Sequence, residues 1–290
     1  MYVLAYFRTE AEAMHLAISE DARNWEPLDD NEPVLTGTVG EQTLRDPFVM
    51  RDQEGTYHLL STDGWRSQHI VHAESHDLLE WSAQELIPVM TDVEGTINSW
   101  APECFYDREE DLYRLIWSST VLEDDVDPAD VEVTSELWDH RIWSATTEDF
   151  EAFTPSEVFF DPGYSVIDAT VAFHGGTYHM VFKDERGSNA LDTEYKALRT
   201  ATAEDGSGPF ENVSDFVSPA PVEGPTVFEH DEEWYLLYDH FTEDHWGASR
   251  SADFENWEVI TDQMAFPPGP RHGSVLEVED ELGERLRERS

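Results

Sequence analysis

The strongest constraint on the fold of this chain is a short pattern that occurs five times. Each copy has a small residue, then Ser or Thr in most copies, then Asp, and an aromatic residue about four positions later. The copies are AISEDARNW (17–25), AESHDLLEW (73–81), ATTEDFEAF (145–153), ATAEDGSGPF (201–210), which is one residue longer, and SRSADFENW (249–257). Repetition at such intervals is the sequence signature of a repeat architecture, in which each copy marks one structural unit.

A second pattern precedes four of these copies and predicts a β-hairpin each time. It consists of an apolar strand, a turn, and an alternating strand rich in aromatic residues. The copies are DPFVMRDQEGTYHLLS (46–61), PECFYDREEDLYRLIWS (102–118), DATVAFHGGTYHMVF (168–182) and GPTVFEHDEEWYLLYD (224–239). The first unit is one strand short, and a spare strand, RHGSVLEVE (271–279), lies at the other end of the chain.

These patterns predict an all-β fold, a five-bladed β-propeller of four-stranded blades that forms a single catalytic domain over residues 1–290. The C-terminal strand 271–279 is expected to pair beside residues 2–7, which closes the first blade and removes an open sheet edge. Residues 119–140 are expected to form a long insertion in the third blade, and the last ten residues a frayed tail or a short surface helix.

The innermost strand of each blade lies beside the central channel, so the residues that open these strands are expected to gather at one rim. The predicted openings are LRDP (44–47), WAPE (100–103), IDAT (167–170), VEGP (222–225) and PRHG (270–273). Three of them place a carboxylate at the opening position, namely Asp46, Asp168 and Glu223. Glu103 is left outside this trio, because it faces the opposite side of its strand from Pro102.

Three carboxylates at one rim predict glycoside hydrolysis. A protonated carboxylic acid must donate to the leaving oxygen while a carboxylate activates water or attacks the sugar. A third carboxylate nearby raises the pKa of the acid by repulsion between like charges. The alternative for each acid taken alone is a plain turn residue, since Asp before Pro and Glu before Gly are common in turns.

The net charge of the chain excludes some classes of binding partner. The net charge is −47, from 64 acidic and 17 basic residues, and lysine occurs only at positions 183 and 196. Such a field repels nucleic acid and anionic membranes, and no segment approaches the ~20 apolar residues of a membrane span. An acidic, hydrated surface with few lysine stems predicts a halophilic source, in which salt screens the repulsion between acids.

Cysteine usage and the first residues bear on location. The single cysteine, Cys104, excludes an intrachain disulfide and a cysteine-based zinc cluster. The N-terminal MYVLAYFRTE has no basic leader or extended apolar run, so we expect a cytoplasmic protein. The sequence leaves the oligomeric state open.

The ordered set RDP, WAPE, IDA, EGP and RHGS resembles glycoside hydrolase family 43, and the resemblance covers nearly the whole chain. It implies a five-bladed propeller that hydrolyses glycosides with inversion. By this resemblance Asp46 is the general base, Asp168 orients the acid and modulates its pKa, and Glu223 is the general acid. One departure is that a partial blade, from MYVLAYF onwards, precedes the base.

Other residues are secondary candidates for substrate binding. Trp65 and Trp100 offer stacking surfaces for sugar rings, and Arg45 binds sugar hydroxyls, holds Asp46 ionised, or forms a plain structural ion pair. The remaining candidates are Lys183, Asp239 and Arg271. His272 matches a family histidine that in some members contacts water or a metal, and this resemblance leaves two alternatives open: a hydrogen-bonded structural histidine, or a calcium ion in the channel. No organic cofactor is expected.

The resemblance implies a carbohydrate substrate, for an α-L-arabinofuranosidase first and a β-xylosidase second. Because no export signal is recognised at the N-terminus, small oligosaccharides and exo-attack are expected rather than cleavage of a polymer. Two other functions stay open. One is a retaining β-fructosidase-like hydrolase, although the Asn-Asp-Pro-Asn motif of those enzymes is missing from the N-terminus. The other is a non-catalytic, sugar-binding propeller.

Overall fold

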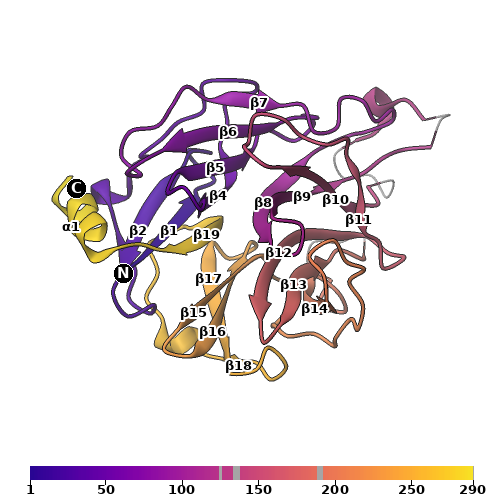
Figure 1. The fold of residues 1–290 in the computed structure, drawn as a ribbon. Coiled ribbons are helices and arrows are strands. Elements are labelled where there is room, and N and C mark those ends of the chain that lie inside the picture. Colours follow the sequence, from indigo (N-terminus) through magenta and orange to yellow (C-terminus); the bar gives the residue numbers. More distant parts are fainter. Residues whose placement is uncertain (124–125, 133–137, 188–191, 290) are drawn as a thin grey trace.

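The computed structural model describes residues 1–123, 126–132, 138–187 and 192–289, and these form five antiparallel sheets arranged around a common centre (Figure 1). The first sheet has the order β19 (Arg271–Glu277), β1 (Tyr2–Phe7), β2 (His15–Ser19), β3 (Glu26–Pro27). The second is β4 (Arg45–Arg51), β5 (Tyr57–Thr62), β6 (Ile70–Ser75), β7 (Glu85–Ile87). The third is β8 (Trp100–Asp107), β9 (Leu112–Ser119), β10 (Arg141–Thr147), β11 (Glu157–Phe160). The fourth is β12 (Val166–His174), β13 (Thr177–Asp184), β14 (Ala197–Ala203), and the fifth is β15 (Glu223–His230), β16 (Glu233–His240), β17 (His245–Ser251), β18 (Glu258–Val259).

The five sheets are the blades of a propeller, which confirms the predicted fold. The strands β4, β8, β12, β15 and β19 each stand at one end of their sheet, and each contacts the next around a closed ring. They are the innermost strands, and their first residues are the predicted openings of the channel. Short 3₁₀ turns at Asp29–Asn31, Pro128–Asp130 and Thr261–Gln263 lie in the connections.

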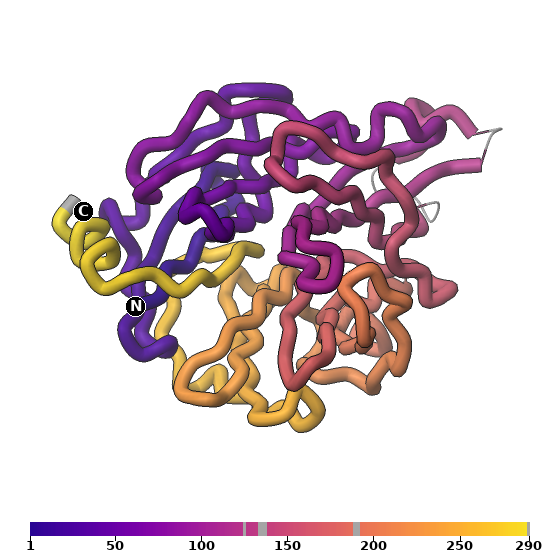
Figure 2. Tube along the Cα trace, in the orientation of Figure 1, coloured from indigo at the N-terminus to yellow at the C-terminus, as the bar shows by residue number. Residues whose placement is uncertain are grey.

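The two ends of the chain complete one blade, as predicted. β1 pairs with β19 in a register that runs from Tyr2 opposite Glu277 to Tyr6 opposite Gly273. Figure 2 shows the indigo N-terminal segment and the yellow C-terminal segment side by side. The tail forms helix α1 (Asp280–Arg289), whose Leu286 is buried against the core between the first two blades. No helix among the described residues is long and apolar enough to cross a membrane.

The fivefold repeat is the turn that follows the third strand of a blade. In four copies a hydroxyl bonds to the Asp two residues later, as Ser75 Oγ does to Asp77, and the Asp carboxylate accepts backbone N–H groups of the turn. The other three pairs of this kind are Ser19–Asp21, Thr147–Asp149 and Ser251–Asp253. The fourth copy has Ala203 in place of the hydroxyl residue.

The prediction of four strands in every blade is wrong for the fourth blade, which has three. The chain after Ala203 still follows β14, but the pairing is irregular. Ser214 Oγ and Ser218 Oγ accept hydrogen bonds from the N–H groups of Thr200 and Leu198, positions where a regular strand would offer a carbonyl. The outer segment therefore covers β14 without forming a ladder.

The insertion between β9 and β10 lies where it was predicted, although positions 124–125 and 133–137 are outside the described residues. The described part reaches over the second blade. Arg66 donates hydrogen bonds to the carbonyls of Pro128 and Val131. Trp138 packs on Trp100, with ring centroids 4.8 Å apart. The insertion thus adds an aromatic side chain beside the channel mouth.

Candidate active site

Each of the innermost strands begins with a β-bulge, and the bulge positions the site. In β4 the register jumps between Arg45 and Phe48, and the same jump occurs in β8, β12, β15 and β19. The residues in the first four bulges, Asp46, Ala101, Asp168 and Gly224, have φ values of +49°, +47°, +54° and +57°. Asp tolerates this left-handed backbone better than most residues, and a bulge re-aims the side chain it carries.

The structure corrects the assumption that the three acids occupy equivalent positions. Asp46 and Asp168 are bulge residues of β4 and β12. Glu223 stands one residue earlier in its blade, because Gly224 occupies the bulge. In register Glu223 therefore matches Arg45 and Arg271, and its longer side chain reaches the same pocket from one position further back.

The channel mouth contains a pocket of about 90 Å³. Its lining combines all three predicted acids with both predicted tryptophans, and the full set is Arg45, Asp46, Thr62, Trp65, Trp100, Ile167, Asp168, Glu223 and His272. Sequence analysis predicted seven of these nine and did not identify Thr62 or Ile167. The pocket is thus built from all five innermost strands, together with the end of β5 and the loop that follows it.

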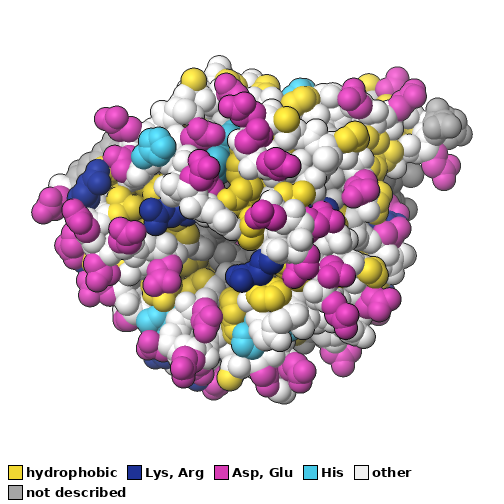
Figure 3. Space-filling model, viewed as in Figure 1, with side chains coloured by type: hydrophobic (Ala, Val, Ile, Leu, Met, Phe, Trp, Pro, Cys, Tyr) yellow, Lys and Arg dark blue, Asp and Glu magenta, His cyan; other side chains and the backbone are white. Residues whose placement is uncertain are grey.

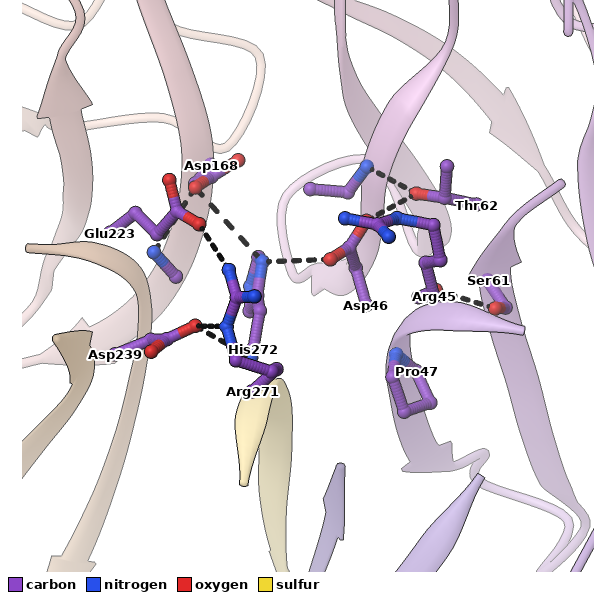
Figure 4. Close-up of polar contacts among 12 residues, drawn as sticks. Arg45, Asp46, Pro47, Ser61, Thr62, Asp168, Glu223, Asp239, Arg271 and His272 are labelled. Atoms are coloured by element: carbon purple, nitrogen blue, oxygen red, sulfur yellow. Dashed lines mark hydrogen bonds and ion pairs between the residues drawn. The ribbon is translucent and has the colours of Figure 1, made fainter. Parts of the chain in front are cut away.

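Asp46 is held ionised at one side of this pocket (Figure 4). Burial alone would raise its pKa, but contact with His272 Nδ1 at 3.5 Å, the nearby charge of Arg45 and a 2.7 Å hydrogen bond from Thr62 Oγ1 outweigh burial. Together they lower the pKa of Asp46 from 3.8 to about 2. Its side chain stays partly exposed to the pocket, so it can accept a proton from a bound water.

Asp168 is more deeply buried and lies on the Glu223 side of His272 (Figure 4). The backbone N–H of Gly224 donates to its Oδ2 at 3.0 Å. Burial raises the pKa of Asp168 to about 6, and the negative charge of Glu223 adds to the rise while His272 opposes it. Asp168 and Glu223 are therefore electrostatic neighbours, the arrangement expected of an acid and its modulator.

Glu223 is held by two cations. Lys183 Nζ lies 2.8 Å from Oε2 and Arg271 Nη2 lies 3.0 Å from Oε1. Each cation has a second acidic partner, because Lys183 also pairs with Glu185 at 2.8 Å and Arg271 with Asp239 at 2.6 Å. Asp239 is fully buried behind Arg271 and does not line the pocket, so its role is to position Arg271. Lys183 likewise supports Glu223 from a buried position.

Arg45 combines two of the roles considered for it, an ion pair and a charge that helps to keep Asp46 ionised. Its Nη1 pairs with Glu12 Oε1 at 2.5 Å, and its guanidinium lies over the rings of Phe7 and Trp65, at 4.7 and 4.8 Å from their centroids. Its positive charge still lowers the pKa of Asp46 from this position. Trp65 is held edge-to-face against Trp100, with ring centroids 5.4 Å apart, and is 47% exposed at the pocket rim.

His272 lies between the two aspartates, with Nδ1 3.5 Å from Asp46 and 4.0 Å from Asp168. Burial lowers its pKa, but the hydrogen bond to Asp46 and the charges of Asp168 and Glu103 raise it more, to about 9. A protonated imidazole has no lone pair for a metal, and calcium prefers oxygen ligands. These residues therefore fit a charged structural histidine better than a calcium site. Calcium in the channel stays a prediction, and the proposed mechanism does not involve it.

Glu103 is an acid of the channel that sequence reasoning set aside. It is buried, bonds to the Thr170 side chain and interacts with Asp168 and His272. Burial raises its pKa to about 8, and its interaction with His272 opposes this rise. Its position could have indicated this role. Thr170, Thr226 and Ser274 occupy the equivalent position in three other innermost strands, and polar residues in a buried strand need partners inside the channel wall.

Gly224 sets the spacing between two parts of the site. Its N–H bonds to Asp168, and a Cβ at this position would lie 2.5 Å from the His272 ring. Gly224→Ala is therefore expected to displace His272, to strain a left-handed backbone, and to lower both the melting temperature and kcat. Gly175→Ala is the matched control, since that glycine also has positive φ but open space around its Cβ. Equal effects of the two substitutions would leave backbone strain as the whole explanation.

Comparison with known proteins places this site in context. Residues 1–283 match the family described as "Probable glycosyl hydrolase domain", which is related to glycoside hydrolase family 43. An α-L-arabinofuranosidase of Bifidobacterium longum is 31% identical over 257 residues, which cover 72% of this chain and 23% of that protein. The chain thus spans about a quarter of that relative. A probable arabinan endo-1,5-α-L-arabinosidase A of Aspergillus flavus is 23% identical over 79% of this chain and 68% of its own length.

Solved structures share the fold. A thermostable family-43 glycoside hydrolase superposes with a TM-score of 0.59 at 19% identity, over 82% of this chain and 80% of that one. A xylan β-1,4-xylosidase from Bacillus halodurans superposes with a TM-score of 0.62 at 17% identity, over 86% of this chain and 48% of that one. These similarities support the five-bladed architecture.

Proposed function

Because the chain belongs to the family of probable glycosyl hydrolase domains related to glycoside hydrolase family 43, we propose that it is an inverting exo-glycosidase acting on small oligosaccharides. The substrates proposed are terminal α-L-arabinofuranosides first and β-xylosides second. One observation carries the proposal: a single small pocket holds three carboxylates in three different electrostatic environments. Different environments give neighbouring carboxylates different pKa values, and this difference lets one act as an acid and another as a base.

Asp46 is the proposed general base. It takes a proton from a water molecule while the water oxygen forms a bond to the anomeric carbon. The glycosidic carbon–oxygen bond breaks on the opposite face of the sugar, and Glu223 gives its proton to the leaving oxygen. Asp46 is partly exposed and ionised, which suits a base that must contact water.

Glu223 must carry a proton before each reaction, and its neighbours hold the carboxyl group in place for this proposed role. Lys183 and Arg271 position the carboxyl group, but each of these cations is already paired, with Glu185 and Asp239. Asp168 is the acidic neighbour of this carboxyl group, and the charge of Glu223 contributes to the raised pKa of Asp168. In this account Asp168 does not react; it orients the acid through the Gly224 segment and modulates its charge.

The shape of the pocket supports attack at a chain end. It is small, and Trp65 and Trp100 form an aromatic wall at its rim. Trp138 from the insertion packs on Trp100 and adds a third aromatic ring to this group. A confined pocket with an aromatic wall suits one terminal sugar ring better than the middle of a polymer.

A screen of nitrophenyl glycosides in molar KCl tests the proposed function. Hydrolysis of the α-L-arabinofuranoside or the β-xyloside is expected. Hydrolysis of sucrose without either would favour a β-fructosidase. Sugar binding measured by calorimetry, without hydrolysis of any substrate, would favour a non-catalytic binding module and overturn the proposal.

We also propose that the protein works at high salt, in the cytoplasm of a salt-accumulating cell, and that residues 1–290 form one catalytic domain. The support is the net charge of −47 and the acidic side chains spread over the visible face of the molecule, with few basic ones between them (Figure 3). At low ionic strength these acids repel one another over ~30 Å, whereas in molar salt the range falls to ~3 Å.

Raising KCl from 10 mM to 2 M is therefore expected to raise the melting temperature by about 10 °C or more. In a domain approaching this size, each kcal/mol added to the free energy of unfolding raises Tm by roughly 2–4 °C, so screening needs to add only a few kcal/mol. Differential scanning calorimetry measures this shift. Sorbitol at equal osmolality is the control, because it strengthens burial without screening charge. A melting temperature that does not respond to KCl, or responds equally to sorbitol, would contradict the halophilic proposal.

A further inference from the structure

A cluster of side chains that can bind a metal lies on the second blade, outside the catalytic pocket. His58 on β5 faces Glu74 on β6, and His72 lies two residues before Glu74 on the same strand. Side chains two apart on a strand share a face, so all three project to the same side of the sheet. Their ligand atoms lie within 4.8 Å of one another, and no other group of this kind occurs among the described residues.

The two imidazoles are buried and point at each other. His58 Nδ1 lies 3.0 Å from His72 Nε2, with the rings nearly parallel. His58 is fixed in place because Phe150, from the turn of the third blade, stacks on it at 3.8 Å. Two ring nitrogens that face each other share one proton in the neutral pair, and a metal ion can take the place of that proton.

A carboxylate behind His58 completes the arrangement found at metal-binding histidines. Asp52 Oδ2 lies 3.2 Å from His58 Nε2, and its other oxygen is anchored by the Thr56 N–H at 2.7 Å. When Nε2–H donates to Asp52, Nδ1 keeps its lone pair on the side of His72 and Glu74. Such a carboxylate–histidine contact fixes the tautomer of a ligand and raises its basicity.

The cluster is open to an ion from solution. His72 and Glu74 line a cavity of about 530 Å³ between the second and third blades, together with Glu85 and Phe150. Glu85 lies opposite His72 in the pairing of β6 with β7, so it is within the same surroundings. The Glu74 side chain is half exposed at the opening, which leaves it free to turn toward an arriving cation.

We propose that His58 Nδ1, His72 Nε2 and the Glu74 carboxylate bind a divalent transition-metal ion, with Zn²⁺ as the best fit and water or Glu85 in the fourth position. Two imidazoles and a carboxylate form a donor set typical of zinc. Two nitrogens on one tetrahedral zinc at ~2.05 Å lie about 3.3 Å apart, a few tenths of an ångström more than the two imidazole nitrogens here. Glu74 Oε1 lies 3.9 Å from His58 Nδ1 and needs only a side-chain rotation to approach.

The proposed ion stabilises the contact between two blades. It joins β5 and β6 of the second blade directly beneath Phe150 of the third. An ion that binds the folded state and not the unfolded chain raises the free energy of unfolding. The inference does not rest on the proposed glycosidase activity, because none of these residues lines the catalytic pocket.

The test uses the full chain stripped with EDTA and then dialysed, with Zn²⁺ or Co²⁺ alone as the probe. One tightly bound Zn²⁺ per chain is expected by calorimetry, with a rise in melting temperature. Co²⁺ is expected to give the strong visible absorption of a four-coordinate site with nitrogen and oxygen ligands. Mg²⁺ at the same concentration is expected to produce neither effect, because it prefers octahedral oxygen ligands.

Three variants separate a built site from general attraction to an acidic surface. Glu74→Gln removes a ligand from an exposed position, and Asp52→Asn removes the carboxylate behind His58; each is expected to weaken Zn²⁺ binding about 10-fold or more. Glu80→Gln, on an exposed residue of the same blade, removes the same charge and is expected to bind like the parent. Binding that is weakened equally by Glu80→Gln, or that is absent in the parent protein, would overturn the proposal.

Discussion

Replacing Asp46 with asparagine is expected to lower kcat on the preferred nitrophenyl glycoside by about 10²–10⁴-fold, the range that a general base contributes. The amide has nearly the same shape and still accepts the Thr62 hydroxyl, so the pocket is preserved. It cannot accept a proton from water. Steady-state kinetics measure the loss, and calorimetry with the free sugar is expected to show that binding is largely retained.

Azide sharpens this experiment, because it attacks the anomeric carbon without having to lose a proton. Azide is expected to restore part of the activity of Asp46→Asn and to yield a glycosyl azide of inverted configuration. Asp92→Asn is the charge-matched control, because Asp92 is exposed in the connection between β7 and β8. This variant is expected to keep full activity. Near-normal hydrolysis by Asp46→Asn would show that another group is the base.

Replacing Glu223 with glutamine is expected to give a loss that depends on the leaving group. Hydrolysis of an oligosaccharide or an alkyl glycoside needs protonation of the departing oxygen, so kcat/KM is expected to fall by about 10²–10⁴-fold. A dinitrophenyl glycoside has a leaving group stable as an anion, so its loss is expected to be far smaller. The measurement is a plot of log kcat/KM against leaving-group pKa, which is expected to become steeper in the variant.

The matched control for this substitution is Glu229→Gln, at an exposed position of the same strand β15. It removes the same charge without touching Lys183 or Arg271 and is expected to behave like the parent. An equal loss on all leaving groups in Glu223→Gln would mean that the glutamate positions the substrate or the cations rather than donating a proton.

Much of the architecture could be predicted because it is encoded in repeated local patterns. The turn after the third strand repeats its hydroxyl–Asp pair, and the spare strand at residues 271–279 has no other blade to complete. The irregular fourth blade could not be predicted from pattern alone. Its outer segment joins β14 through serine side chains and scattered backbone hydrogen bonds rather than through a regular ladder, and no apolar alternation distinguishes the two arrangements.

The sequence predicted which residues form the site more successfully than it predicted their positions in the strands. The motifs around Asp46, Asp168 and Glu223 mark the openings of innermost strands, but a β-bulge adds one residue to each, and the bulge is not visible in the apolar pattern. In β15 the bulge is occupied by Gly224 rather than by an acid, so Glu223 stands one position before Asp46 and Asp168 in register. Glu103 was set aside for a related reason, because alternation was counted through the bulge as though the strand were regular.

Contacts between distant parts of the chain were beyond sequence reasoning. Both lysines of the chain bind Glu185, Lys183 at 2.8 Å and Lys196 at 2.6 Å, but the sequence drew attention only to the first. Thr62, which holds Asp46, and Trp138, which backs Trp100, reach the site from a second strand and from an insertion. Such contacts depend on how blades face each other, which local patterns do not specify.

The central claim is that Asp46 directs water to the face of the sugar opposite the leaving group. Proton NMR of the first product formed from the preferred glycoside, recorded within seconds to minutes and before mutarotation, tests it most directly. The account predicts that the anomeric configuration of the released sugar is inverted relative to the substrate, as expected for carboxyl groups about 6.5–9.5 Å apart with water between them. A product that first appears with the configuration of the substrate retained would contradict it.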